Sequence, residues 1–432
     1  MAMDGKELVE KLAKLSQVQS IKDIPQLTHA LFPGTHCPLM GAAMAVGGIK
    51  DSLIVVVGTD ECTYYTKSMT IHSEKFGGID GRCVSVVLDD HDVTFGSAEK
   101  VQGAFKEIIE EYRPQCVFLV TTCVIEIIGD DFDAISEGLS ELYGIPVLPV
   151  HTEHFKCEDH LPGLERTITV CAEMMKSCDC DNSVNLLGQR MGDFATTELY
   201  AMLQKAGVKI GLQLPCGCSV DDIKNAAAAK VNIVVNDIAL PLAQKMQEKF
   251  GIPYVYFNKF VIPEKIYEAY KNLFGYLELE LPGELEGLYQ NAREKIEKNK
   301  GELEGITYIY GNTPYAVFEM NCFLSSLGMV PQVIQTNRYT EADEPYAKEI
   351  LQYTDPYVCK AANIAPLQYV YDVLSPYLYL GHEFGNRLRQ KGIAIVHSDR
   401  ASGMLGFEVT GYLLQQLVKS VREAKEYRKE LC

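Results

Sequence analysis

The chain has 432 residues, of which 47% are hydrophobic and 23% charged, and its formal net charge is −18 at pH 7. This length and apolar content predict a globular protein of two or three α/β units, of which we expect three, and exclude a disordered or fibrous chain. The acidic balance excludes a nucleic-acid partner, because phosphate binding requires a basic face and the scattered C-terminal lysines and arginines form none.

The N-terminal residues 1–15 have the polar and apolar period of a surface helix and not the pattern of a signal peptide. No apolar run approaches the roughly 18 residues that a membrane span needs. We therefore expect a cytoplasmic protein with no membrane partner. In that reducing compartment the 14 cysteines favour metal binding over a disulfide framework, while Cys116 and Cys171 lie in apolar runs typical of a core.

Short apolar runs recur along the chain and predict strands of parallel sheets that are covered on both faces. Between them, amphipathic stretches with glycine near their ends predict helices, among them 97–112, 130–144 and 240–251. This alternation predicts an α/β fold with parallel sheets. The runs that we interpret as strands are 53–57, 84–87, 116–120, 145–150, 232–235, 254–257, 306–310, 330–334 and 393–396.

Two polar segments separate groups of these elements. Residues 176–194 change from an apolar helix to a polar stretch, and residues 279–304 form a charged helical stretch before a new strand. We therefore predict three Rossmann-like domains, with boundaries near 185 and 302. Residues 1–185 form the N-terminal domain, 186–302 the middle domain and 303–432 the C-terminal domain.

Three cysteines, Cys37, Cys62 and Cys123, lie in turns that contain glycine, proline or threonine beside apolar segments. Cys62 and Cys123 each follow a predicted strand, at the carboxyl end where α/β proteins gather their chemistry. Thiolates presented from turns are the ligands that iron-sulfur clusters need. The separations of 25 and 61 residues are wider than in a ferredoxin run, so three ordinary loop cysteines remain the alternative.

A histidine-rich segment follows the predicted strand 145–150. Its members His151, His154, Cys157 and His160 have near-helical spacing, which fits either a metal site or a loop that faces a substrate. Further along, His397 ends the predicted strand 393–396, where it is either a ligand or a hydrogen-bonded loop residue. No phosphate loop of the Gly-x4-Gly-Lys-Ser/Thr type occurs, so we expect no nucleotide binding by this chain.

Several of these segments resemble the nitrogenase component 1 superfamily, which includes molybdenum-iron protein subunits, cofactor-assembly scaffolds and dark-operative protochlorophyllide reductases. The most specific is the sequence TTCVIEIIGDDFDAI at 121–135, similar to the family's turn at its third cluster cysteine. The resemblance implies the three-domain architecture of nitrogenase component 1. The other similar segments are 37–62, 144–155, 230–255 and 397–418.

The resemblance also implies cofactors and partners. By position, Cys37, Cys62 and Cys123 are similar to the family's ligands to a 4Fe-4S cluster or an eight-iron P-cluster at a subunit interface. His397 is similar to the histidine that binds the iron-molybdenum cofactor, so a second metallocofactor is a further expectation. The companion cysteine of that site is missing, because the corresponding stretch 234–236 reads Val-Val-Asn.

The implied assembly is a dimer or an α2β2 heterotetramer with a homologous subunit, and the implied electron donor is a separate ATP-dependent 4Fe-4S reductase protein. Our first hypothesis is therefore a subunit of a nitrogenase-like oxidoreductase that passes single electrons to a metallocofactor or an organic substrate. The second hypothesis is a cofactor-assembly scaffold subunit. A third is an unrelated α/β transferase in which the cysteines are incidental.

Overall fold

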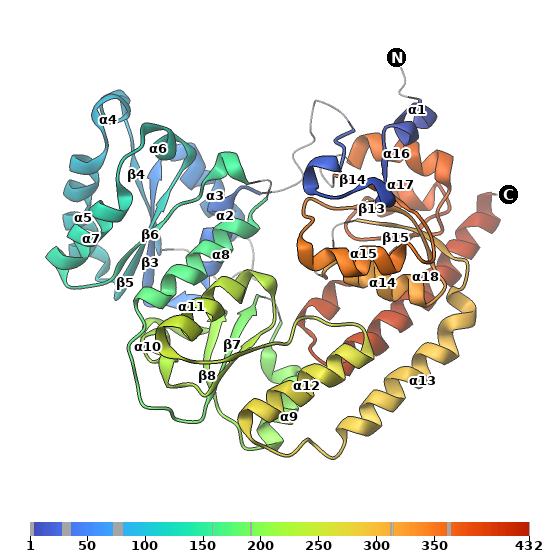
Figure 1. Ribbon diagram of the computed structural model, residues 1–432. Coiled ribbons are helices and arrows are strands. Elements are labelled where there is room, and N and C mark those ends of the chain that lie inside the picture. The colour runs from blue at the N-terminus through green and yellow to red at the C-terminus, as the bar shows by residue number, and fades with distance from the viewer. Residues whose placement is uncertain are drawn as a thin grey trace.

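The computed structural model describes residues 4–27, 36–71, 81–157, 159–190, 192–311, 313, 315–360 and 364–431. These residues form a mixed α/β protein with three principal sheets, in which nearly all strand pairs are parallel (Figure 1). The predicted α/β fold with parallel sheets is thus confirmed. In the part of the chain that the structure describes, no helix combines the length and the apolar character that crossing a membrane requires.

The first sheet has the strand order β4-β3-β5-β6. Its two central strands are buried along their whole length, as continuous apolar runs in a doubly covered sheet should be. Helices α5 and α7 cover one face, and α2 and α8 cover the other. The elements are α2 (Pro38–Gly47), β2 (Ile49–Lys50), β3 (Ser52–Gly58), α3 (Asp60–Ile71), β4 (Cys83–Val87), α4 (Asp90–Phe95), α5 (Ala98–Tyr112), β5 (Cys116–Thr121), α6 (Cys123–Ile128), α7 (Phe132–Tyr143), β6 (Val147–Val150) and α8 (Leu161–Val170).

The second sheet has the order β11-β10-β7-β8. Its helix α11 shares one hydrophobic cluster with α2 and α8, so the first and second sheets are joined through a common layer of helices. The elements are β7 (Val184–Gln189), α9 (Glu198–Lys205), β8 (Ile210–Pro215), β9 (Cys218–Ser219), α10 (Val220–Lys224), β10 (Val231–Val234), α11 (Leu240–Phe250), β11 (Tyr254–Tyr256), α12 (Pro263–Leu277) and α13 (Leu285–Leu303).

The third sheet has six strands in the order β1-β14-β13-β12-β15-β16. Helices α14 and α18 pack on one face, while α1 and α16 pack on the other. The elements are β12 (Thr307–Tyr310), α14 (Val317–Ser326), β13 (Val330–Gln335), α15 (Glu344–Ile350), β14 (Tyr357–Cys359), α16 (Ile364–Leu374), β15 (Leu378–Leu380), α17 (Gly385–Arg389), β16 (Ala394–Val396) and α18 (Phe407–Leu431).

The N-terminal segment 4–27 belongs to this third sheet and not to the first. It contains α1 (Gly5–Glu10) and β1 (Ala13–Lys14), and β1 pairs antiparallel with β14, with Ala13 opposite Val358. Leu8 and Leu12 are buried in the same cluster as Val333 of β13. Our domain boundaries near 185 and 302 stay a prediction, and the start of the chain adds a strand to the far end of the fold.

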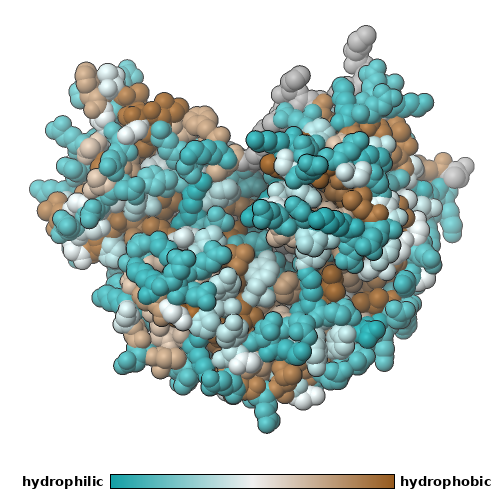
Figure 2. Space-filling view, in the orientation of Figure 1, coloured by the Kyte–Doolittle hydropathy of each residue, from teal (hydrophilic) through white to brown (hydrophobic). Residues whose placement is uncertain are grey.

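Helices α2 and α8 approach each other closely at two glycines. A Cβ atom built on Gly163 would lie 2.6 Å from the carbonyl carbon of Pro38, and one built on Gly41 would lie 2.8 Å from the amide nitrogen of Leu164. Backbone therefore packs against backbone at the first turn of α2. On the molecular surface, a notch separates the lobe of the first sheet from the lobe of the third sheet (Figure 2).

Candidate metal centre

Each of the three predicted cluster cysteines lies at the N-terminus of a helix. Cys37 is the N-cap of α2, Cys62 is in the first turn of α3, and Cys123 is the first residue of α6. Helices α3 and α6 follow β3 and β5, which are neighbouring parallel strands with Val57 opposite Thr121. The structure therefore brings Cys62 and Cys123 to the same edge of the first sheet. Helix α2, which begins after Cys37, packs against α3 and β5.

The three cysteines lie in an environment that differs from that of core residues. All three thiols are half-buried and free of disulfides. Burial raises the pKa of the Cys123 thiol, and negative charge on Cys62 and on Cys37 raises it further, so the sulfurs of Cys62 and Cys37 each lie within electrostatic range of Cys123. Helix N-termini stabilise negative charge. This arrangement counteracts the mutual repulsion of three thiolates.

This donor set fits an iron-sulfur cluster. Sulfur ligands from turns suit iron-sulfur clusters, and a cluster takes each thiolate on a different iron atom. Within the described residues, no group of three or more His, Cys, Asp or Glu side chains is placed to hold a single metal ion. The role of the three cysteines as cluster ligands stays a prediction.

The sequence Ile-Gly-Asp-Asp after Cys123 fixes the far end of α6. Gly129 ends the helix with a φ of +82°, a conformation that favours glycine. Asp130 accepts hydrogen bonds from the backbone N and the Oγ of Ser97 at 2.7 and 2.6 Å. Asp131 caps α7 by accepting from the N of Ala134 at 2.9 Å. The motif therefore fastens the short helix that carries Cys123 to two neighbouring helices.

The two threonines before Cys123 fix the near end, and sequence reasoning assigned them no role. The Oγ1 of Thr122 donates to the carbonyl of Val57 at the end of β3 at 2.9 Å. The Oγ1 of Thr121 donates to Glu126 Oε1 at 2.8 Å. Glu126 Oε1 also accepts from the backbone N of Glu153 at 2.6 Å. Cys123 is thereby held between two strands and the loop after β6.

Large apolar side chains are exposed around Cys62 and Cys123. Tyr64 is 72% exposed, Ile127 is 70% exposed and Phe95 is 77% exposed. Tyr65 is also exposed, and α4, which carries Phe95, contacts α6. Figure 2 shows apolar surface over this edge of the first lobe. We call Tyr64, Tyr65, Phe95 and Ile127 the cysteine-side patch, and such clustering is typical of a protein interface.

The histidine-rich segment does not converge on a metal site. His151 Nε2 lies 3.2 Å from Asp133 Oδ2, and the Cys157 thiol lies 3.8 Å from Arg166 Nη1. Burial, and then the charge of Arg190, lower the pKa of His160 to about 4. These side chains therefore serve separate contacts. A loop that faces a substrate stays a prediction.

His397 lies immediately after β16 with an exposed side chain, and its carbonyl accepts from the hydroxyl of Tyr412 at 3.5 Å. Its role as a cofactor ligand stays a prediction. Val234 and Val235, which stand where a companion cysteine was sought, are completely buried and offer no ligand atom.

A partly buried polar cluster that sequence reasoning missed lies between the second and third sheets. Tyr256 donates to Asp237 Oδ1, and Asn258 Nδ2 donates to the same oxygen at 3.1 Å and to the Tyr256 hydroxyl at 2.7 Å. Glu319 of α14 is only 6% exposed, and among the described residues its Oε1 has no hydrogen-bond partner. Burial raises the pKa of Glu319 to about 7; the positive charge of Lys265 opposes this shift and the negative charge of Asp237 adds to it.

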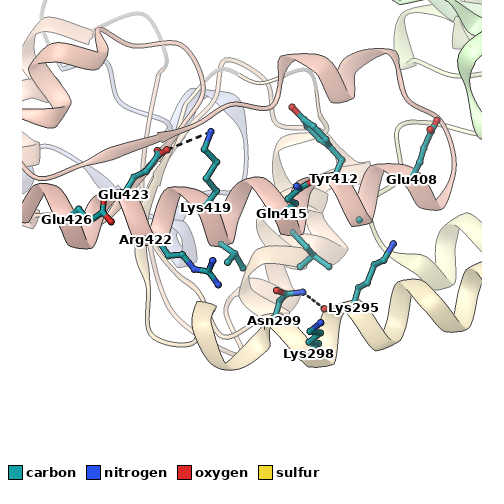
Figure 3. Close-up of a pocket in the computed structure, with 13 residues that line it drawn as sticks. Lys295, Lys298, Asn299, Glu408, Tyr412, Gln415, Lys419, Arg422, Glu423 and Glu426 are labelled. Atoms are coloured by element: carbon teal, nitrogen blue, oxygen red, sulfur yellow. Dashed lines mark hydrogen bonds and ion pairs between the residues drawn. The ribbon is translucent and has the colours of Figure 1, made fainter.

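A groove between two long helices has a different character. It lies between α13 and α18, with a volume of about 870 Å³, and charged side chains such as Lys295, Lys298, Arg422 and Glu423 line it (Figure 3). Arg422 is already paired with Glu302 at 2.8 Å. These are solvated helix faces, so this groove does not compete with the cysteine site as the functional centre.

Comparison with known proteins agrees with this geometry. A family model described as nitrogenase component 1 type oxidoreductase matches residues 37–422 and thus begins at Cys37. Among solved structures, "Nitrogenase Cp1 at pH 6.5" superposes with a TM-score of 0.79, covering 95% of this chain and 96% of that chain at 15% identity. At that identity the likeness shows the fold alone.

Among relatives, the nitrogenase iron-molybdenum cofactor biosynthesis protein NifE of Clostridium pasteurianum is 31% identical over 224 residues, 51% of this chain and 49% of that protein. The NifE of Rippkaea orientalis is 25% identical over 331 residues, 73% of this chain and 69% of that protein. The nitrogenase molybdenum-iron protein alpha chain of Methanosarcina barkeri is 24% identical over 73% of this chain and 62% of that protein. The match to the first of these spans about half of the relative's length.

Proposed function

Because the chain belongs to the nitrogenase component 1 type oxidoreductase family, we propose that it is a subunit of a nitrogenase-like iron-sulfur oxidoreductase. Its electrons arrive singly from an ATP-dependent iron-sulfur reductase and leave to a metallocofactor or an organic substrate. The sequence lacks a phosphate loop, which agrees with ATP hydrolysis by the partner.

One observation carries the proposal. Three cysteines far apart in sequence, Cys37, Cys62 and Cys123, stand at three helix N-termini around one edge of a sheet, and negative charge on the first two acts on the third. When bound there, an iron-sulfur cluster supplies one-electron storage and transfer. The protein's own contribution is the thiolate ligands, the helix N-termini that stabilise their charge, and the hydrogen bonds that fix α6.

The same site supports a homologous partner subunit. A cubane cluster takes four protein ligands, and this chain brings three cysteines to the site. The cysteine-side patch around them is apolar and exposed. A second subunit that covers the patch and supplies the remaining ligation accounts for both features, in a homodimer or in an assembly of two homologous chains.

A cofactor-assembly scaffold is the second candidate, and a specific observation favours it. Two of the relatives described above are named as iron-molybdenum cofactor biosynthesis proteins. A scaffold would have the same cluster cysteines as a reductase. The two would differ in the group that is held where the sheets meet. A resident group that stays through turnover supports the reductase, and a precursor that can be exchanged supports the scaffold.

The test is anaerobic purification of the chain with its natural partner, followed by iron and sulfide quantitation and EPR of the dithionite-reduced protein. Cys62→Ala and Cys123→Ala should each lose iron and the reduced-cluster signal. The matched control is Cys116→Ala, because Cys116 is a fully buried core residue at the start of the strand that precedes Cys123. An iron-free wild type, or equal iron loss in the control, contradicts the proposal.

A further inference from the structure

The loop after β6 is hydrogen-bonded to helix α6, which carries the third cysteine. We call residues 151–153, the first part of this loop, the β6 loop. Glu126 of α6 accepts from the Oγ1 of Thr152 at 3.1 Å and from the backbone N of Glu153 at 2.6 Å, both on its Oε1 atom. Thr152 is only 1% exposed. One carboxylate oxygen therefore fastens two consecutive loop residues to α6.

The same loop is also bonded to helix α8. Arg166 of α8 donates from Nη1 to the carbonyl of Thr152 at 2.6 Å and to the carbonyl of His151 at 3.2 Å. Its Nη2 lies 2.5 Å from Oε2 of Glu153. Arg166 thus contacts every residue of the β6 loop, and its rigid, planar guanidinium fixes their relative directions.

These two attachments connect the supports of two cluster cysteines. Cys123 is the first residue of α6 and lies three residues before Glu126. Helix α8 packs backbone to backbone on α2 at Gly163, three residues before Arg166, and Cys37 is the N-cap of α2. A path of hydrogen bonds and close contacts therefore runs from the helix of Cys123 through the β6 loop to the helix of Cys37.

Packing alone does not hold α6 against this loop. A cavity of about 340 Å³ lies beside them, and its lining includes Glu126, Ile127, Glu153 and Phe155. Ile127 and Phe155 are each 70% exposed. Protein interiors are normally close-packed, so that side chains fix one another in place. Next to this cavity the hydrogen bonds have to supply the fixation.

The backbone of the β6 loop is strained where the two attachments meet. Glu153 has a φ of +44°, in the left-handed region that favours glycine. A hydrogen bond from Lys156 lowers the pKa of its carboxyl, burial opposes this shift, and the charge of Arg166 lowers the pKa further. Strained residues persist where their surroundings enforce the conformation, and they cluster at functional sites. Here the backbone N bonds to Glu126 while the side chain bonds to Arg166.

We propose that Glu126 and Arg166 are positioning residues, which bind the β6 loop to α6 and to α8 and thereby fix the Cys123 thiol relative to the Cys37 thiol. They act through the loop and the two helices and not as ligands. A binding constellation must be held within about 0.5 Å, and residues behind the ligands tune a metal site. The inference rests on the proposed function, because it concerns the geometry of the cluster's ligands.

The test uses the full chain, purified anaerobically with its natural partner. Iron content, the EPR spectrum of the reduced protein and the midpoint potential from an EPR-monitored redox titration are measured. Glu126→Ala removes the acceptor and should change the ratio of oxidised to reduced cluster at a fixed potential at least threefold, or by about 28 mV at 59 mV per tenfold. Glu126→Gln keeps a carbonyl oxygen that accepts the same bonds and should retain the wild-type potential and line shape.

Two further variants complete the set, and a thermal melt reports whether each of them folds. Arg166→Met cuts the loop's bonds to α8 from a different element and should shift the potential and alter the line shape as Glu126→Ala does. Glu137→Ala, at an exposed glutamate of α7, should change neither. Equal shifts in Glu126→Ala and Glu126→Gln would mean that charge and not position matters, and this result overturns the inference.

Hydrogen exchange of α6 in the same preparations needs no cluster and separates the two proposals. Exchange should be faster in Glu126→Ala than in the wild type or in Glu126→Gln. An iron-containing wild type whose potential, spectrum and exchange are matched by Glu126→Ala overturns the positioning role and leaves the redox function standing. An iron-free wild type in which Glu126→Ala still accelerates exchange contradicts the redox function and supports the attachment of α6 through Glu126.

Discussion

The close contact between α2 and α8 yields a sharp prediction, since it sets the position of Cys37. In Gly163→Ala the new Cβ would overlap the carbonyl oxygen of Pro38 and would stand 2.6 Å from its carbonyl carbon, where an ordinary contact begins at 3.4 Å. The two helices must therefore separate by more than about 0.8 Å, which exceeds the roughly 0.5 Å within which a binding constellation must be held. We expect the overpacking to cost about 1–3 kcal/mol and cluster iron to fall at least twofold.

Iron quantitation and EPR of the anaerobically purified protein measure this effect, and a thermal melt reports whether the fold survives. Gly138→Ala is the matched control, because Gly138 lies within α7 and a Cβ there would meet no atom within 4 Å. That change should stabilise the helix by roughly 0.5–1 kcal/mol and leave iron unchanged. Wild-type iron and an unaltered EPR signal in Gly163→Ala refute the reasoning.

Three further predictions concern other parts of the molecule. The pKa of Glu319 is raised to about 7, so the contribution of this carboxyl to the free energy of unfolding falls as the pH rises from about 4.5, its pKa in the unfolded chain, to about 7. Between pH 4 and pH 8 the wild type should therefore lose about 3 kcal/mol of stability that Glu319→Gln does not lose. The same dependence of the free energy of unfolding on pH in variant and wild type argues against this role of Glu319. Asp130→Ala removes the acceptor of two Ser97 hydrogen bonds and should lower the free energy of unfolding by about 1–3 kcal/mol, whereas an unchanged thermal midpoint contradicts that role. Tyr65→Asp places a charge in the cysteine-side patch and should shift the assembly toward smaller species in analytical ultracentrifugation, and an unaltered distribution removes the patch as an interface.

The first sheet could be predicted from the sequence because its central strands are recognisable from their own residues alone. The runs 53–57 and 116–120 are apolar at every position, which matches burial on both faces of β3 and β5. Cys62 and Cys123 could be singled out because they follow those strands. The same reasoning could not find β1, whose two residues pair with Val358 and Tyr357 far along the chain and have no local pattern of their own.

The charged residues that are buried between the second and third sheets could not be predicted from the sequence either. Lys259 and Glu319 resemble ordinary surface residues in the sequence, and only the packing of the second sheet against the third buries them. The short strands β14 and β15 lie in mixed segments whose strand character depends on their neighbours in the six-stranded sheet. Tertiary context decided these features, so periodicity and spacing did not reveal them.

The pairing of β1 with β14 has a consequence for how the lobes can move. Because the chain starts in the third sheet, passes through the first and second sheets and returns, the lobe with Cys37, Cys62 and Cys123 is covalently an insertion within the third. The cysteine lobe is therefore tied to the third lobe in two ways, directly through the chain before α2 and indirectly through the second sheet, with which it shares a layer of helices. An opening between the cysteine lobe and the third lobe has to accommodate both connections.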